Sequence, residues 1–385
     1  MIDVLIVGAG VAGCATAVAL KNIMPDLDIC ILDRGQQNSL ALDSYEQCYS
    51  QSIRPKIGET LPPSVMIPLQ QLGLWEGFLA ASFIKCSGTS SSWGASTPYT
   101  NEHIFSAYGN GWHLDRQQFD DLLLTAARKQ KIRMIKSAQF LNISKQKNSW
   151  SLAFQTKEQS NLQQQCIEAK FVIDASGRAA KVAQKMGVNK QIYDHLLGIY
   201  RFYKQDKEKS SHQAVDSSTL IESAEQGWWY SASLPKHKHV VALMTDIDIA
   251  QVNAYRQSTH FDQALAETQQ IVRRLEGLNA NNKPIVCAAN TQCLDQLAGN
   301  GWLAVGDAAF TFDPLSSLGI FKALRMSLYA SYAVKDYFQA KDSGLVKYQK
   351  VAKAEFNNYL EKRKEYYAEE IRFSKQPFWA RRLAA

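Results

Sequence analysis

Residues 3–13 read DVLIVGAGVAG, a short apolar strand that runs directly into a Gly-x-Gly-x-x-Gly turn and the start of a helix. In this motif Gly8 permits the tight turn, Gly10 lets the backbone approach a pyrophosphate, and Gly13 allows the helix to pack closely on the strand. The free amides at the helix start face phosphate oxygens. The stretch therefore predicts a dinucleotide site. Its residues are Gly8, Ala9, Gly10, Val11, Ala12 and Gly13.

A second apolar stretch supports this prediction. Residues 28–33 read DICILD and end at Asp33, twenty residues after Gly13. An acidic side chain at this distance can accept hydrogen bonds from the ribose hydroxyls of an adenosine-bearing cofactor. We expect Asp33 and the adjacent Arg34 to belong to the cofactor site.

Composition limits the function classes. The 385 residues are 46% hydrophobic, which predicts a globular protein with a substantial core. The net charge of +7 is modest for this length, and no Lys/Arg run is interleaved with aromatic residues, so we expect no nucleic-acid binding. A mildly basic protein of this kind suits an anionic cofactor or an acidic partner surface.

The seven cysteines and the apolar runs bear on the compartment. The cysteines are scattered without a Cys-x-x-Cys pair, which argues against a disulfide framework and against a zinc site, so no metal is expected. The first strand lacks the basic leader of a signal peptide, and no apolar run reaches the ~20 residues of a membrane span. These patterns predict a cytoplasmic protein with reduced thiols.

The order of predicted elements indicates that the nucleotide-binding region is interrupted. Apolar periodicity predicts a helix over 116–129, and alternating segments between 193 and 247 predict an antiparallel sheet. A buried strand at 301–307 then returns the chain to the first region. The expected divisions are a nucleotide-binding domain of 1–82, 105–186 and 284–330, a substrate-domain sheet of 83–104 and 187–283, and a helical C-terminal region of 331–385.

Four segments together carry a family resemblance. They are the glycine motif at Gly8, LDR at 114–116, DASGR at 174–178, and GDAA at 306–309 followed by DPLSSLG at 313–319. In this order they resemble the single-domain flavoprotein monooxygenases and flavin-dependent halogenases across nearly the whole chain. The resemblance implies an α/β fold with an FAD-binding Rossmann-like domain, an inserted antiparallel sheet and a helical C-terminus, and it implies an FAD-dependent monooxygenase.

The resemblance also implies the roles of several residues. The segment at Gly306 and Asp307 would hold the ribityl chain, Arg116 would contact FAD, and the loop ending at Gly319 would bracket the isoalloxazine ring. A helix beginning near residue 318 would direct its positive end at the flavin N1–C2=O edge and stabilise the anionic reduced form. A helix cap is the alternative for Asp307, and a buried cap and a surface ion pair are the alternatives for Asp174 and Arg178. The further cofactor residues expected are Glu59, Thr60, Arg116, Gly306, Asp307, Pro314, Leu318, Gly319 and Ile320.

Two segments and a lysine resemble the halogenase branch more closely. GETLP at 58–62 resembles the GEATxP strap, which connects the cofactor and substrate regions, and DPLSSLGI at 313–320 resembles DPLESTGI of tryptophan halogenases. Lys85 lies eight residues before Trp93 and matches the lysine that directs hypochlorous acid in those enzymes. We therefore expect Lys85 and Ser317 to be catalytic, with an ordinary exposed strand lysine as the alternative for Lys85.

Departures from the halogenase pattern distinguish oxygenation from halogenation. Ser316 replaces the glutamate that pairs with the halogenase lysine, and Leu318 replaces the threonine at the halide site. The WxWxIP signature is absent, and its nearest counterpart is GWWYSASLP at 227–235. These changes favour oxygenation over halogenation. Trp228, Trp229 and Tyr230 are candidate aromatic walls for a flat substrate, and ordinary sheet core is the alternative.

The end of the chain narrows the expected substrate. RKEYYAEE at 363–370 and QPFWARR at 376–382 resemble the ends of flavoproteins that mature quinone cofactors in bacterial glycine and lysine oxidases. This implies hydroxylation of a tryptophan in a precursor protein, toward cysteine tryptophylquinone, with molecular oxygen and with electrons from NAD(P)H or a separate flavin reductase. A C-terminal clamp packed on the core, a small-molecule halogenase or hydroxylase, and a non-catalytic flavin-binding assembly factor remain alternatives.

Overall fold

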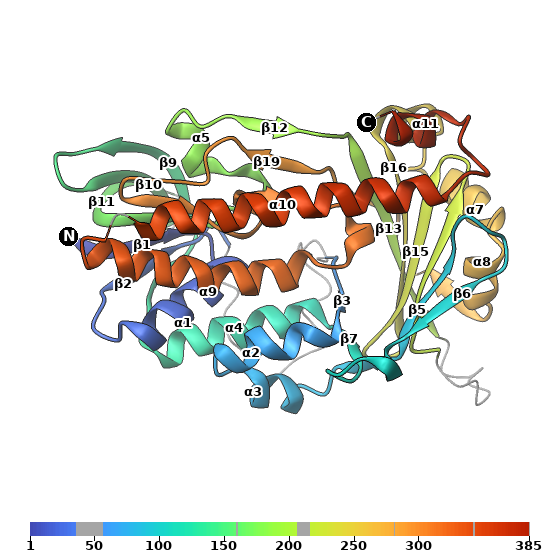
Figure 1. The fold of residues 1–385 in the computed structure, drawn as a ribbon, viewed down its shortest axis with the longest axis horizontal. Coiled ribbons are helices and arrows are strands. Elements are labelled where there is room, and N and C mark those ends of the chain that lie inside the picture. The colour runs from blue at the N-terminus through green and yellow to red at the C-terminus, as the bar shows by residue number, and fades with distance from the viewer. Residues whose placement is uncertain (36–56, 159–160, 206–215, 281, 342, 385) are drawn as a thin grey trace.

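The computed structural model describes residues 1–35, 57–158, 161–205, 216–280, 282–341 and 343–384. It contains two large sheets that lie beside each other, with helices around the first and a long C-terminal helix along both (Figure 1). The fold is mixed α/β, as the sequence predicts. Five cysteines of the described part are free thiols, namely Cys30, Cys86, Cys166, Cys287 and Cys293, and Cys48 lies outside that part.

The first sheet is built on parallel strands. Its order is β20-β21-β11-β1-β2-β8, and β1 pairs in parallel with both β2 and β11. β1 is almost entirely buried, as expected for a central strand of a sheet that is covered on both faces. The strands are β1 (Ile2–Val7), β2 (Ile29–Leu32), β8 (Arg133–Ile135), β9 (Ala138–Lys145), β10 (Trp150–Glu158), β11 (Asn161–Asp174), β20 (Ala298–Gly299) and β21 (Trp302–Ala304).

Helices cover this sheet and bring distant segments together. α1 packs against α4 and α9, so the glycine turn lies next to the segment after residue 306. The helix predicted over 116–129 is confirmed as α4, and Asp115 caps it by accepting from Gln117 N and Gln118 N. The helices are α1 (Val11–Ile23), α2 (Met66–Gln71), α3 (Trp75–Ala80), α4 (Arg116–Lys129), α5 (Lys181–Lys185) and α9 (Gly319–Phe338).

The second sheet is mainly antiparallel, in the order β17-β13-β16-β15-β14-β5-β6 with β18 beside β13. β18 lies in this sheet, although the expected boundary at residue 284 assigned it to the first region. The strands are β5 (Gly88–Ser92), β6 (Tyr99–Glu102), β13 (Leu196–Gln205), β14 (Thr219–Ala224), β15 (Gly227–Leu234), β16 (Lys238–Asp246), β17 (Leu278–Ala280) and β18 (Ile285–Ala288). The accompanying helices are α6 (Ile247–Val252), α7 (Ser258–Ala266) and α8 (Gln270–Arg274).

Smaller elements connect the two sheets. One three-stranded sheet has the order β3-β7-β4 and another the order β12-β19-β22. These strands are β3 (Thr60–Leu61), β4 (Ile84–Cys86), β7 (Gly111–His113), β12 (Lys190–Ile192), β19 (Gln292–Leu294) and β22 (Phe310–Thr311). Short 3-10 turns are η2 (Pro63–Val65), η3 (His103–Phe105), η4 (Gly177–Ala179), η6 (Gly306–Ala308) and η7 (Pro314–Ser316).

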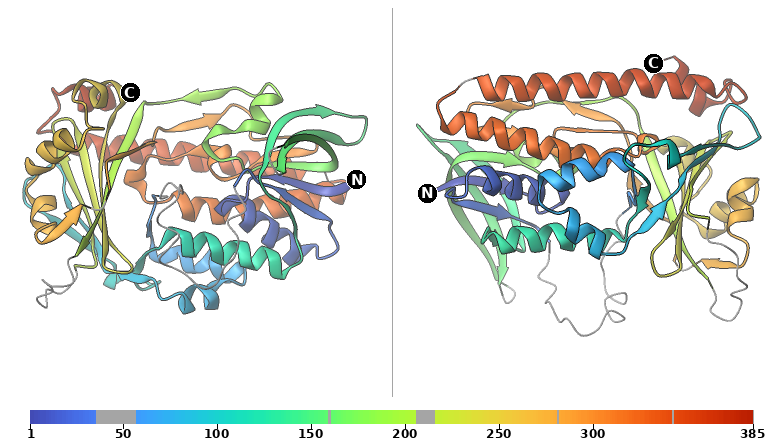
Figure 2. Two further views of the ribbon diagram at one scale, coloured as in Figure 1. Left: turned by 180° about the vertical axis from the view of Figure 1, so that it is seen from behind. Right: turned by 60° about the horizontal axis from the view of Figure 1, so that its bottom comes forward.

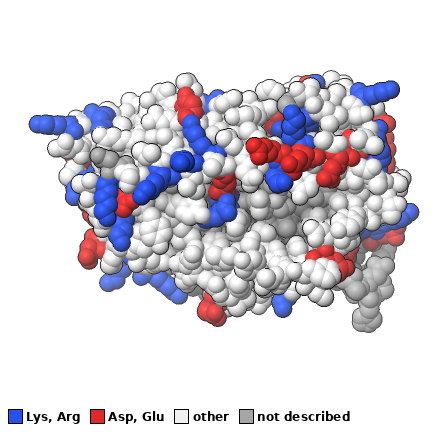
Figure 3. Space-filling view, in the orientation of Figure 1, with Lys and Arg blue, Asp and Glu red and all other residues white. Residues whose placement is uncertain are grey.

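The C-terminal region spans the molecule. α10 (Ser343–Glu369) runs beside α9 from the first sheet to the second, and α11 (Pro377–Leu383) ends the chain against the second sheet (Figures 1 and 2). Basic and acidic side chains are interspersed on the face shown in Figure 3.

Candidate functional site

The three glycines of the N-terminal motif have different surroundings. Gly8 has φ +113°, and a Cβ there would lie 2.3 Å from the Ala175 carbonyl oxygen. A Cβ at Gly13 would lie 1.9 Å from the Gly8 oxygen, whereas a Cβ at Gly10 would have no atom within 4 Å. The fold itself thus requires Gly8 and Gly13. Gly10 faces open space at the start of α1, which is where a pyrophosphate would lie.

Asp33 closes the other side of this turn. Its Oδ1 accepts from Ala9 N at 2.9 Å and its Oδ2 from Gly35 N at 2.9 Å, so the carboxylate is fixed at the end of β2. Each oxygen keeps a second lone pair for a ribose hydroxyl. The next residue, Arg34, is exposed.

Gly306 brings Asp307 to the glycine turn. Gly306 has φ +63°, and a Cβ there would lie 2.5 Å from the Ala12 Cβ, so only glycine lets this turn approach α1 so closely. The Asp307 side chain is 42% exposed and accepts from Lys322 Nζ at 2.8 Å. Asp307 is therefore an open acceptor beside the start of α1, and its contact is an ion pair with a lysine from α9.

Sequence reasoning missed Lys322. Its side chain is fully buried, and Nζ also donates to the Phe310 oxygen at 2.5 Å and lies 4.9 Å from the Phe310 ring centroid. A lysine among the apolar positions of a predicted helix, three residues after Gly319, is the signal that could have shown it, since buried ammonium groups need an acidic partner.

The strap residues connect the two sheets. Arg116 Nη1 donates to the carbonyls of Ile57 and Gly58, so this guanidinium holds the strap chain against α4. Thr60 Oγ1 lies 2.7 Å from the Tyr230 hydroxyl on β15. The strap is thereby fixed to α4 beside the first sheet and to β15 of the second sheet.

Glu59 is a buried carboxyl within the strap. It is 2% exposed, Oε2 accepts from Gly58 N at 3.0 Å, and Oε1 has no hydrogen-bond partner among the described residues. Burial raises the pKa of Glu59 to about 7, against the opposing effect of the Arg116 cation. Glu59 Oε1 is therefore an acceptor that a water or a bound molecule can satisfy.

The loop before α9 is held by its own polar groups. Asp313 accepts from Leu315 N at 2.9 Å, and Ser316 Oγ donates to the Asp313 carbonyl. Ser317 has φ +51°, which turns the chain toward Leu318 at the start of α9. Gly319 is exposed, and a Cβ there would meet nothing within 4 Å. The N-terminus of this 20-residue helix therefore faces open space.

Comparison with known proteins decides what this site binds. The sequence pattern of the family described as "FAD binding domain" matches residues 1–360. The chain is a member of this FAD-binding family. It is also 30% identical, over 99% of its length and 97% of the relative's, to the putative FAD-dependent oxidoreductase LodB of Marinomonas mediterranea.

Solved structures share the flavoprotein fold. The myxobacterial chondrochloren halogenase CndH superposes with a TM-score of 0.84 at 18% identity, covering 99% of this chain and 85% of CndH. The peptidyl tryptophan dihydroxylase QhpG superposes with a TM-score of 0.74 at 18% identity, covering 99% and 78%. The expected fold class, the FAD cofactor and the assignment as an FAD-dependent oxidoreductase are confirmed.

The flavoprotein's residues fit FAD. The open space at Gly10 fits the pyrophosphate, Asp33 the ribose, Asp307 the ribityl hydroxyls, and the N-terminus of α9 the flavin ring. When bound and reduced, FAD supplies the electrons that activate molecular oxygen.

Asp174 and Arg178 have structural roles. The fully buried Asp174 accepts from Val182 N at 3.0 Å and from Ala183 N at 2.9 Å, so it caps α5. Arg178 donates to Asn290. The alternative of a buried cap is correct for Asp174, while Arg178 makes a hydrogen bond and no ion pair within the part of the chain that the structure describes.

The residues predicted to form aromatic walls, Trp228, Trp229 and Tyr230, do not share one face of the sheet. Trp228 and Trp229 are each 1% exposed and lie on opposite faces of β15, because neighbouring strand residues alternate. Trp228 Nε1 donates to the Tyr367 hydroxyl, and Trp229 packs on Phe261 of α7. Both tryptophans are sheet core rather than an open wall, and Tyr230 contacts the strap.

Lys85 takes no part in the contact between Thr60 and Tyr230. It is exposed on β4 and pairs across the strand with Trp112, whereas Ile84 pairs with His113, which in turn pairs with Thr60. Cross-strand partners share a face of the sheet, so Lys85 points to the face opposite that of Thr60. Its catalytic role, like that of Ser317, stays a prediction.

Ionisation of Glu59 should make the folded apoprotein less stable as pH rises. Because its pKa is near 7 when folded and about 4.5 when unfolded, the native state binds the extra proton between these values. Stability is then retained below about pH 4.5 and falls as pH rises through 7, by about 3 kcal/mol in total. Glu59→Gln should remove this dependence.

Urea denaturation of the FAD-free proteins at pH 5 and pH 8 measures this effect. The exposed Glu102→Gln on β6 is the matched control and should behave as the unmodified protein. Equal pH dependence in Glu59→Gln and Glu102→Gln would contradict the assignment.

No helix in the described ranges combines the length and apolar character needed to cross a bilayer.

Proposed function

We propose that this flavoprotein is an FAD-dependent oxygenase that hydroxylates a tryptophan side chain within a precursor protein, toward the tryptophylquinone cofactor of an amino-acid oxidase. The similarity to LodB over nearly the full length, and to QhpG in fold, supports this proposal. QhpG is a peptidyl tryptophan dihydroxylase essential for tryptophylquinone cofactor biogenesis.

Two residues of the loop before α9 favour oxygenation over halogenation. Leu318 stands where the resemblance places a halide-binding threonine, so no hydroxyl is present for a halide. Ser316 replaces the glutamate that would pair with a catalytic lysine, and its hydroxyl donates to the Asp313 carbonyl of its own loop. The residues that define halide chemistry are therefore missing or engaged in the loop itself.

The chain's own groups would exclude water and orient the substrate. The Thr60–Tyr230 contact closes the strap onto the second sheet, which would limit water entry between them. One oxygen atom of O2 would enter the indole ring and the other would leave as water, with two electrons from reduced FAD. A precursor protein adds binding area remote from the indole, which orients the ring. NAD(P)H or a separate flavin reductase would supply the electrons.

Reoxidation kinetics test the proposal. The reduced holoprotein is mixed with oxygen in the presence and absence of the precursor, with and without bromide. We expect the precursor to accelerate flavin oxidation and bromide to change nothing. Acceleration by free tryptophan alone or a brominated product would support a small-molecule enzyme. A precursor complex with unchanged reoxidation and no product would indicate an assembly factor.

A further inference from the structure

The C-terminal helix α10 contacts the loop that precedes α9. It lies beside α9 over the first sheet and continues to the second sheet (Figures 1 and 2). The loop of residues 313–318, here called the flavin loop, leads directly into the first turn of α9. Three α10 side chains, from Tyr359, Arg363 and Tyr367, reach Asp313 at the start of this loop.

Asp313 is 1% exposed, and three α10 side chains contact it. The Tyr367 hydroxyl donates to Oδ2 at 2.8 Å, and Arg363 Nε lies 3.5 Å from the same oxygen. The Asp313 amide donates to the Tyr359 hydroxyl at 2.7 Å. Within the loop, Asp313 Oδ1 accepts from Leu315 N, and the Asp313 carbonyl accepts from the Ser316 amide and hydroxyl. The position of the loop start therefore depends on α10 as well as on the contacts within the loop.

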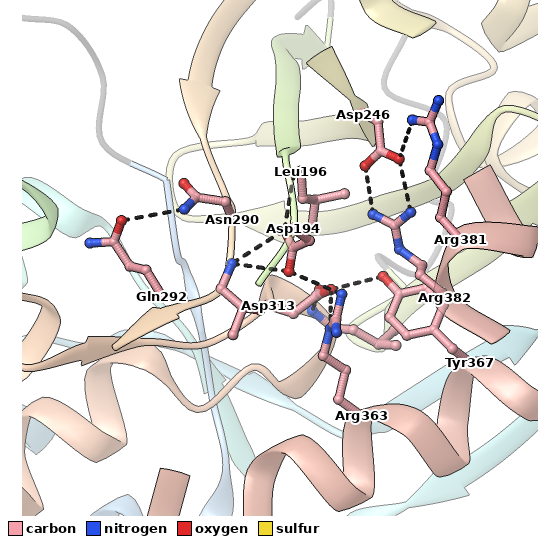
Figure 4. Close-up of polar contacts among 12 residues, drawn as sticks. Asp194, Leu196, Asp246, Asn290, Gln292, Asp313, Arg363, Tyr367, Arg381 and Arg382 are labelled. Carbon is pink, nitrogen blue, oxygen red and sulfur yellow. Dashed lines mark hydrogen bonds and ion pairs between the residues drawn. The ribbon is translucent and has the colours of Figure 1, made fainter. Parts of the chain in front are cut away.

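Two of these side chains, from Tyr367 and Arg363, also reach the second sheet, as Figure 4 shows for Arg363. The Tyr367 hydroxyl accepts from Trp228 Nε1 at 3.0 Å. Arg363 Nη2 donates to Asp194 Oδ2 at 3.0 Å, and Asp194 Oδ1 accepts from Leu196 N at the start of β13. Tyr367 and Arg363 thus hold the flavin loop and two strands of the second sheet in one arrangement.

We propose that Tyr367 and Arg363 are positioning residues that set the flavin loop, and with it the first turn of α9, against the bound flavin. The positive end of α9 stabilises negative charge on reduced flavin more than it stabilises the neutral oxidised form. Loss of the Tyr367 donor leaves Asp313 Oδ2 with a single distant partner and lets the loop shift. The proposal rests on FAD binding and is independent of the substrate.

Tyr367→Phe tests this with its neighbour as the control. Tyr366 is 53% exposed and its hydroxyl makes no hydrogen bond among the described residues, so Tyr366→Phe removes the same atom without touching the loop. We expect Tyr367→Phe to weaken binding of reduced FAD about tenfold more than binding of oxidised FAD. This shifts the midpoint potential about 30 mV more negative. Tyr366→Phe should leave it unchanged.

Arg363 provides the second pair of variants. Arg363→Gln should shift the potential in the same direction, and Arg363→Lys, which keeps the charge but loses the fork, should shift it less. A purely structural role would lower the unfolding temperature and leave the potential of the bound flavin unchanged. Potentials equal to that of Tyr366→Phe in Tyr367→Phe and Arg363→Gln would overturn the proposal. If Tyr367→Phe does not fold, the two Arg363 variants decide it.

Discussion

We expect the Gly10→Val protein to fold normally and to be purified without FAD. Gly10 has φ −74° and ψ −173°, an extended conformation that valine adopts readily, and a Cβ there meets no protein atom within 4 Å. The added methyl groups would occupy the space that the pyrophosphate needs beside the amides of α1. Overlap of this kind should weaken FAD binding roughly a hundredfold or more.

Comparison with Gly13→Val separates binding from folding. A Cβ at Gly13 would lie 1.9 Å from the Gly8 oxygen, so that variant should lose the fold itself. For Gly10→Val, unfolding of the apoprotein should stay within about 1 kcal/mol of the unmodified protein. The flavin-to-protein absorbance ratio measures the first effect and chemical denaturation the second. Stoichiometric flavin in Gly10→Val would contradict the assigned pyrophosphate position.

Asp307→Asn should destabilise the apoprotein by about 2–3 kcal/mol and also abolish FAD retention. The change leaves the fully buried Lys322 ammonium with the Phe310 carbonyl but without its carboxylate, and an unpaired buried charge is costly. The Asp307 side chain is 42% exposed, so water would offset part of that cost. FAD would be lost because asparagine offers the ribityl hydroxyls one neutral acceptor oxygen in place of the two oxygens of a charged carboxylate.

A double variant isolates the charge. Lys322→Met fills a similar volume without an ammonium group, so adding it to Asp307→Asn should restore most of the lost stability. FAD binding should not return, because the carboxylate at position 307 is still missing. The free energy of unfolding in urea is compared for Asp307→Asn, Lys322→Met and the double variant. If all three values are the same, the ion pair does not stabilise the site.

Sequence alone predicted the parts of the site that depend on local pattern. The turn at Gly8 and Gly13 and the acid at Asp33 follow from backbone geometry and spacing, and the limits of α4 follow from its cap at Asp115 and its apolar face. The family resemblance added Asp307 and the loop before α9. These segments form a site because parallel strands end at one edge of the sheet.

Long-range packing decided the rest. Trp228 and Trp229 alternate across β15, and what covers each face depends on α7 and on Tyr367, more than a hundred residues further along the chain. Likewise, the facing direction of Lys85 depends on its pairing with Trp112 in a three-stranded sheet. No local pattern reveals which face of such a strand the second domain covers.

The proposed hydroxylation is tested most directly by the fate of heavy-isotope oxygen. The holoprotein, an electron donor and the purified precursor are incubated under isotopically labelled O2, and the tryptophan-containing peptides of the precursor are analysed by mass spectrometry. We expect labelled oxygen on a precursor tryptophan, dependent on bound FAD and absent with the Gly10→Val protein. Complete reoxidation of the flavin with no label on any precursor peptide would contradict the proposed function.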